Sequence, residues 1–121
     1  MDLDTFLDLP AGEVAAVVRR AGPKVCVFPC NGTRRWYMLE YPVEQPGPDL
    51  LWNYLTAIER RHIELYQLLF DHGIDYLLTP AFGPDLTERG DDYNEIAAKG
   101  LEHLATDAKF LDFYSEYDVR V

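Results

Sequence analysis

The segment VFPCNGTRRW, residues 27–36, joins an apolar run to a turn that carries one glycine and two adjacent arginines. The run itself, KVCVFP at residues 24–29, is apolar, rich in β-branched residues and bounded by proline, which is typical of a buried strand. A glycine after a strand lets main-chain N–H groups turn towards an anion. The guanidinium groups of Arg34 and Arg35 can each pair two phosphate oxygens. The segment therefore predicts a phosphate- or diphosphate-binding turn, and the alternative is two surface arginines that pair with nearby carboxylates.

Length and charge limit the classes of protein that need to be considered. The 121 residues are 48% hydrophobic, which suits a single domain that covers residues 1–121. The formal net charge is −10, so nucleic acid and anionic membrane surfaces are not expected partners. The acidic excess lies mainly beyond Glu44, because up to that residue 5 basic side chains accompany 6 acidic ones. A local anion site in the first third of the chain is compatible with this distribution.

Membrane and secretion signals are not expected in this sequence. No apolar run approaches the roughly 20 residues that span a bilayer, and the acidic start MDLDTFLDLP does not resemble a signal peptide. We therefore expect a cytoplasmic protein without a transmembrane segment. Cys26 and Cys30 lie on or beside the first predicted strand, about 13 Å apart, which exceeds the roughly 7 Å limit for a disulfide. Both are expected to be reduced thiols.

Apolar periodicity and turn residues along the chain predict an alternation of helices and strands. This alternation is typical of the α/β class, with a parallel sheet flanked by helices. The expected helices lie at residues 10–22, 49–72, 92–105 and from 106 onwards, and the expected strands at 24–29, 74–80 and 118–121. Gly73 is expected to end the second helix, Asp92 with Glu95 to form the capping box of the third, and Thr106 to cap the fourth.

Parallel sheets place ligand sites at the carboxyl ends of their strands. The turn at residues 30–36 follows the first expected strand, and the loop FGPDLTERG, residues 82–90, follows the second. We expect both to open on the same crevice, where Arg89 of the second loop would converge on Arg34 and Arg35.

Five segments that follow one another along the chain carry a family resemblance: FLDLP, GPKVCVFP, GTRRW, LFDHGI and RGDDY, which begin at residues 6, 22, 32, 69 and 89. In the same order, they resemble the cis-prenyltransferase superfamily, and most closely its branch of diterpene synthases of the tuberculosinol type. The resemblance covers essentially the whole chain and implies the first half of a cis-prenyltransferase-like fold, since chains of that family continue well beyond this length.

The resemblance implies a prenyl diphosphate substrate, Mg²⁺ as cofactor, and loss of diphosphate followed by capture by water or an acceptor. Tyr54 matches a tyrosine that the diterpene branch uses to stabilise the carbocation or to orient the capturing group. Asn31 occupies the catalytic position where the family carries aspartate, although an amide cannot act as a base and binds Mg²⁺ more weakly than a carboxylate does. The residues implied to bind diphosphate are Gly32, Thr33, Arg34, Arg35 and Arg89.

Three explanations fit a chain of this length: a fragment of a longer enzyme, one subunit of a split enzyme, or a non-catalytic binding or regulatory subunit. We expect a homo-oligomer, or a partner chain that supplies the C-terminal half of the fold, because an expected third strand at the end of the chain leaves a sheet edge and an apolar helix face uncovered. A generic phosphate-ligand binder is a further alternative.

Other polar residues have simpler interpretations. The histidines show no spacing typical of a metal site, so no protein ligand to a metal is assigned. His62 lies on the apolar stripe of the long helix and is expected to be a core or half-buried histidine. Arg60 and Arg61 are expected to pair with Glu59 and Glu64 on an exposed helix face.

Overall fold

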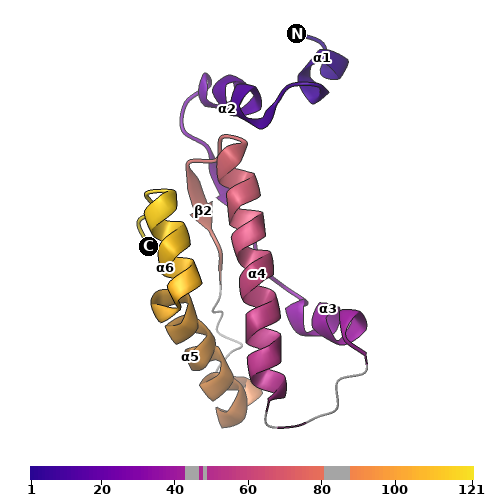
Figure 1. Cartoon of the computed structure of the whole chain (residues 1–121), viewed down its shortest axis with the longest axis vertical. Helices are drawn as coiled ribbons and strands as arrows, with labels where there is room; N and C mark the ends of the chain where they lie inside the picture. Colours follow the sequence, from indigo (N-terminus) through magenta and orange to yellow (C-terminus); the bar gives the residue numbers. More distant parts are fainter. Residues whose placement is uncertain (43–46, 48, 81–87) are drawn as a thin grey trace. The chain divides into compact units, whose positions relative to one another are not determined.

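The computed structural model describes residues 1–42, 47, 49–80 and 88–121, and these residues form six α-helices and two β-strands (Figure 1). Contacts divide the chain into one unit made of residues 1–30 and 64–80 and a second made of residues 31–63 and 81–121. The elements in order are α1 (Leu3–Leu7), α2 (Ala11–Arg19), β1 (Val25–Val27), α3 (Thr33–Glu40), α4 (Leu50–Asp71), β2 (Tyr76–Leu78), α5 (Asp91–Thr106) and α6 (Ala108–Glu116).

In the first unit, β1 and β2 form a parallel two-stranded sheet, as the sequence pattern predicts. Val25 pairs with Tyr76 and Val27 with Leu78. The pairing continues past the strand, because the Phe28 N–H donates to the carbonyl of Leu78 at 2.9 Å. The combination of helices with a parallel pair is compatible with the expected α/β class.

The end of α4 is determined locally by Gly73, as expected from the sequence. The Gly73 N–H donates to the carbonyl of Phe70 and the Ile74 N–H to that of Leu69, both at 3.1 Å. This pair of bonds is a Schellman motif, which needs a residue with positive φ after the helix, and Gly73 has φ 97°. A Cβ on Gly73 would lie 2.9 Å from Cα of Ala15, so glycine also allows α2 to approach closely.

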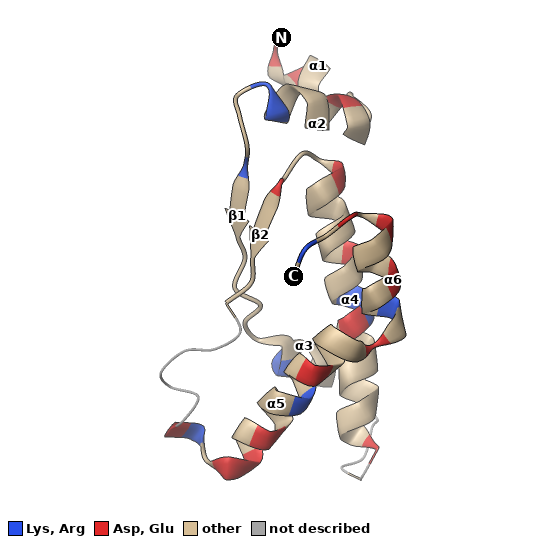
Figure 2. Ribbon diagram, turned by 90° about the vertical axis from the view of Figure 1, so that its left-hand side faces the viewer, with Lys and Arg blue, Asp and Glu red and all other residues tan. Residues whose placement is uncertain are grey.

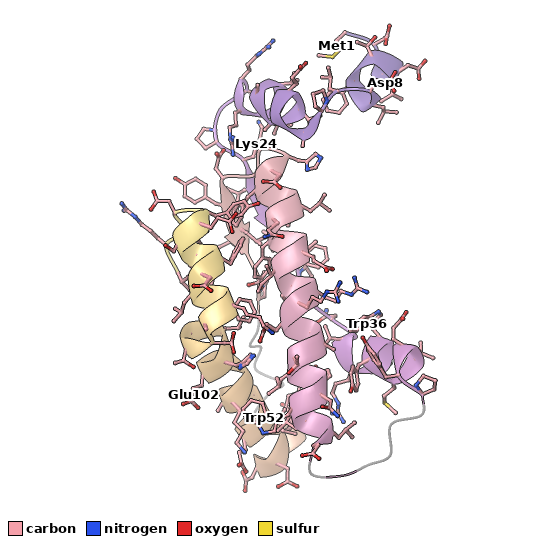
Figure 3. The ribbon with its side chains drawn as sticks, viewed as in Figure 1. Met1, Asp8, Lys24, Trp36, Trp52 and Glu102 are labelled. Atoms are coloured by element: carbon pink, nitrogen blue, oxygen red, sulfur yellow. The ribbon has the colours of Figure 1, made fainter. Side chains whose placement is uncertain are left out.

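The second unit contains α3, the first part of α4, α5 and α6. Its buried apolar side chains belong to α3, α4 and α6, and they are Tyr37, Leu55, Ile58, Phe110 and Phe113. Trp36 is carried by α3 (Figure 3). The guanidinium carbon of Arg61 on α4 lies 5.8 Å from the centroid of the Trp36 ring. His62 is half-buried, as predicted.

The predicted third strand at residues 118–121 is wrong. These residues instead end α6 with a second Schellman motif, in which the Val119 N–H donates to the carbonyl of Tyr114 at 2.8 Å. Asp118 takes the position with positive φ, at 51°. The apolar pattern of a short segment cannot produce a strand unless a neighbouring strand completes its hydrogen bonds.

Two helices were not expected, α1 and α3, and two helix starts differ from the prediction. Gly90 is the N-cap of α5, where Asp92 was expected. At the start of α6 the Asp107 carboxylate accepts the N–H of Lys109 at 2.8 Å and replaces the expected Thr106.

The thiols of Cys26 and Cys30 are free, as predicted. None of the helices in the described ranges is long and apolar enough to cross a membrane.

Candidate functional site

The start of α3 is arranged as an anion-binding helix terminus. The helix begins directly after Gly32, whose φ of 77° is accessible to glycine, and no side chain caps it. The first main-chain bond that enters the helix runs from the Trp36 N–H to the carbonyl of Gly32 at 2.9 Å. The N–H groups of the first turn therefore have no acceptor within the helix and add to its positive dipole end.

Arg34 and Arg35 place two further positive charges in this first turn, which contains no acidic residue (Figure 2). Helices usually carry acids there, because carboxylates offset the dipole. Neither guanidinium makes an ion pair with any carboxylate in the described ranges, so the alternative of two surface ion pairs gains no support among these residues. The Arg35 guanidinium lies over Gly32, 3.7 Å from where a Cβ would stand.

Next to this terminus, side chains of α3, the start of α4 and α5 line an open pocket of about 420 Å³. Its walls combine aromatic and aliphatic side chains with one cation, a composition suited to an apolar ligand that carries an anionic group. The lining residues are Arg34, Tyr37, Met38, Tyr41, Pro42, Gly47, Leu50, Leu51, Tyr54 and Ile96.

Tyr54 joins the pocket to the start of α3. Its hydroxyl lies 2.9 Å from that of Thr33. Burial raises the pKa of the Tyr54 phenol, and the Thr33 hydrogen bond and the Arg34 charge offset part of that rise. The ring of Tyr54 meets that of Tyr37 edge to face, with centroids 5.5 Å apart. Tyr54 is therefore a neutral phenol at physiological pH, and its contacts with Thr33 and Tyr37 fix its position.

Tyr37 and Tyr41 are pocket residues that the sequence analysis missed. Tyr37 is 4% exposed, and its ring lies 4.8 Å from that of Tyr41. Their four-residue spacing places both on one face of a helix, but that signal is visible only once residues 33–40 are recognised as helical rather than as a turn.

Arg89 belongs to the same unit and approaches the site through Tyr93. Its guanidinium donates to the Tyr93 hydroxyl at 3.3 Å and lies 5.0 Å from the ring centroid. Tyr93 is in turn close enough to Tyr54 to raise its pKa. The remainder of the second predicted loop, residues 81–87, lies outside the described residues.

Asn31 is exposed and directly precedes Gly32. In the described ranges, the only set of three or more His, Cys, Asp or Glu side chains close enough to hold an ion is Glu59, His103 and Asp107, and Asn31 is not part of it. Mg²⁺ prefers several oxygen ligands, usually including a carboxylate. The described residues at the start of α3, with one amide and two arginines, do not fit a magnesium site by themselves.

Glu59 was expected on an exposed helix face, and this prediction is wrong. Its side chain is 2% exposed and contacts Nε2 of His103 at 2.5 Å and Nζ of Lys109 at 2.7 Å. The Lys109 contact is an ion pair between a largely exposed ammonium group and the buried carboxylate, and it raises the pKa of Lys109. Helical periodicity places Glu59 next to the buried Ile58, but only the position of α5 and α6 determines that it points inward.

Comparison with known proteins agrees with part of the sequence prediction. No family model matches the chain. The chain is 46% identical over 116 residues to tuberculosinyl adenosine transferase of Mycobacterium tuberculosis (strain CDC 1551 / Oshkosh). The matched region is 96% of this chain and 37% of that relative. The predicted resemblance to tuberculosinyl transferases is confirmed, and the chain is similar along nearly its whole length to just over a third of that relative.

Proposed function

We propose that this chain processes prenyl diphosphates as part of a diterpene synthase or prenyl transferase with a cis-prenyltransferase-like fold. The observation that carries the proposal is the uncapped start of α3, where Arg34 lines a pocket walled by tyrosines and aliphatic side chains and Arg35 lies over Gly32. Similarity to a protein named as a tuberculosinyl transferase supports the same conclusion.

In this proposal the diphosphate group binds the first-turn N–H groups of α3, including that of Thr33. Arg34 and Arg35 supply charge-assisted hydrogen bonds, and Arg89 is assigned to the same group. Gly32 keeps the approach free of a side chain. The hydrocarbon part of a bicyclic diterpenyl diphosphate occupies the adjacent pocket.

The reaction begins when the allylic C–O bond breaks and its electron pair leaves with the diphosphate. The bound anion is stabilised by the positive end of α3 and its arginines, which favours this charge separation. The faces of Tyr37 and Tyr54 stabilise the carbocation, an interaction worth about 2 kcal/mol when desolvated. Water or a nucleophilic acceptor then forms the new bond to carbon.

Magnesium enters this proposal only through the resemblance. When bound, Mg²⁺ would neutralise diphosphate oxygens. Because the described residues at this site do not fit it, its carboxylate ligand would come from another part of the complete enzyme, and no step above depends on the ion.

We also propose that the chain associates with a further polypeptide. This partner is either a second copy of the chain or a polypeptide that corresponds to the rest of the relative. Parallel sheets are normally covered on both faces. Here one face of the pair carries Val25, Val27, Tyr76 and Leu78, each between 55% and 59% exposed. A stable monomer at micromolar concentration in sedimentation would contradict this part.

The second candidate is a non-catalytic prenyl-diphosphate-binding subunit, and Asn31 favours it because the resemblance implies aspartate there. The two candidates differ in turnover. Substitution Asn31→Asp should raise turnover if Asn31 limits catalysis, and should leave binding unchanged within about threefold, roughly 0.7 kcal/mol.

The test is incubation of the chain with diterpenyl diphosphates and Mg²⁺, alone and with a polypeptide that corresponds to the rest of the relative. Pyrophosphate release and product are followed together. Calorimetry with inorganic pyrophosphate measures binding separately, and the double variant Arg34→Gln/Arg35→Gln is the control that should lose it. Binding without turnover supports the subunit, and absence of both contradicts the proposed function.

A further inference from the structure

The two hydroxyl groups of Thr33 and Tyr54 connect two parts of the site that have different chemistry. Thr33 is the first residue of α3, within the turn assigned to the diphosphate. Tyr54 lines the apolar pocket, and its hydroxyl lies 2.9 Å from Oγ1 of Thr33. A threonine hydroxyl has one proton and two acceptor lone pairs, so it can accept from a phenol while it donates to an anion.

We propose that Tyr54 and Thr33 form a proton relay, in which the proton of the capturing nucleophile reaches the departed diphosphate through two hydroxyl groups. The inference depends on the proposed function and adds a role for Thr33 that diphosphate binding alone does not require. In this relay both are catalytic residues, because Tyr54 takes the proton of the nucleophile and Thr33 passes a proton to the diphosphate.

The relay balances for capture by water. Heterolysis of the C–O bond leaves an allylic cation and diphosphate. A lone pair of water then forms the new C–O bond, and the resulting oxonium proton passes to the Tyr54 oxygen. As it does so, the Tyr54 proton moves to Oγ1 of Thr33, and the Thr33 proton moves to a diphosphate oxygen. One proton has moved from water to diphosphate, and both hydroxyl groups are restored.

Two features of the site favour this route over a carboxylate base. Asn31 offers an amide, which cannot accept the proton. Burial raises the pKa of Tyr54, so the phenol stays protonated and acts as a neutral shuttle. The diphosphate product is itself the final proton acceptor, and Thr33 lies on the side of Tyr54 where that anion is proposed to bind.

The first test requires no turnover. The full chain is prepared with ¹³Cζ-labelled tyrosine, the Tyr54 resonance is assigned with Tyr54→Phe, and inorganic pyrophosphate is added to saturation. The Tyr54 signal should shift in the parent protein and in Thr33→Ser. The shift should be much smaller in Thr33→Val, where only the charge of the bound anion acts on Tyr54; this variant retains the main-chain N–H and should bind pyrophosphate no more than about tenfold more weakly.

The second test measures turnover. It uses whichever preparation consumes prenyl diphosphate, the chain alone or the chain with the polypeptide that corresponds to the rest of the relative. Thr33→Val should lower kcat about 100-fold while KM rises no more than about tenfold, because the lost group acts mainly in proton transfer. Thr33→Ser should recover most of the rate. If the Thr33→Val protein has the same kcat as the parent, or if its Tyr54 resonance shifts with pyrophosphate as much as in the parent, the relay is overturned. The proposed function is then unaffected. A parent chain that neither binds pyrophosphate nor consumes substrate overturns the proposed function and the relay together.

Discussion

Nζ of Lys109 lies 2.7 Å from Oε1 of Glu59, so a lysine side chain that is 64% exposed reaches a carboxylate that is 2% exposed. Glu59 comes from α4 and Lys109 from α6, and His103 of α5 contacts the other carboxylate oxygen. A buried carboxylate is costly unless it is paired. This cluster therefore makes the packing of three helices depend on a few charged groups.

Removal of the lysine tests that dependence. Lys109→Met should lower the free energy of unfolding by about 1–3 kcal/mol, because Oε1 of Glu59 would lose its cationic partner. Lys99→Met is the matched control: Lys99 pairs with Glu95 at 2.8 Å on the exposed face of α5, a pair worth a few tenths of a kcal/mol. Urea denaturation measures both. Equal losses in the two variants would contradict the prediction, and Glu59→Leu/Lys109→Met should recover stability.

Two glycines provide a second matched pair. Gly73→Ala should destabilise by about 1–3 kcal/mol, because alanine strains the positive φ of 97° and its Cβ would meet Cα of Ala15 at 2.9 Å. Gly12→Ala, within α2 and with no neighbour inside 4 Å, should stabilise by about 0.5–1 kcal/mol. Thermal unfolding of the two variants should shift the midpoint in opposite directions, and a Gly73→Ala protein as stable as its parent would refute the close approach of α2.

Asp75 should make stability depend on acidity. The pKa of this carboxylate is lowered chiefly by the Lys24 N–H, which donates to it at 2.9 Å, and also by Arg19, whose Nε lies 3.1 Å away. A lowered folded-state pKa contributes stability above the unfolded value of about 3.9 and loses it as the pH falls through the folded value. Asp75→Asn should therefore be less stable than the parent at pH near 7.

The same variant should lose less stability than the parent when the pH falls below about 4. Chemical denaturation at neutral and acidic pH measures the difference. Asp112→Asn, an exposed position on α6, is the control and should follow the parent at both pH values. An Asp75→Asn protein whose acid sensitivity equals that of the parent would contradict the assignment.

The start of α3 predicts a specific loss of anion affinity. Arg34→Gln should weaken binding of pyrophosphate about 10- to 100-fold, since a charge-assisted hydrogen bond contributes about 1.5–3 kcal/mol. Arg20→Gln removes the same charge from the C-terminal end of α2 and should change the affinity less than about twofold. Calorimetry at one fixed salt concentration compares the two, and equal losses would indicate a general charge effect rather than a site.

Local signals identified much of the fold. Gly73 predicted the end of α4 because a positive φ after a helix favours glycine whatever the surroundings. The strand composition around Val25 and Tyr76 predicted the parallel pair, and several short segments were sufficient to indicate the resemblance.

Where the sequence analysis failed, the deciding contact was distant along the chain. Residues 33–40 contain two adjacent arginines that suggest an exposed turn, but Tyr37 is buried against α4 and α3 forms. Residues 118–121 have the composition of a strand, but no neighbouring strand pairs with them in the described part of the chain. Glu59 is followed in the sequence by Arg60 and Arg61, which suggests an exposed position, but its side chain is buried.

The amino-acid sequence by itself determined which residues could bind an anion, where α4 ends and which family the chain resembles. Each of these depends on side-chain chemistry and backbone conformation within a few residues. Only the folded chain decided that Thr33 meets Tyr54 and that Glu59 faces inward, since each contact joins residues 21 or more positions apart. Burial and hydrogen bonding at such separations depend on how helices pack, and no local pattern specifies that.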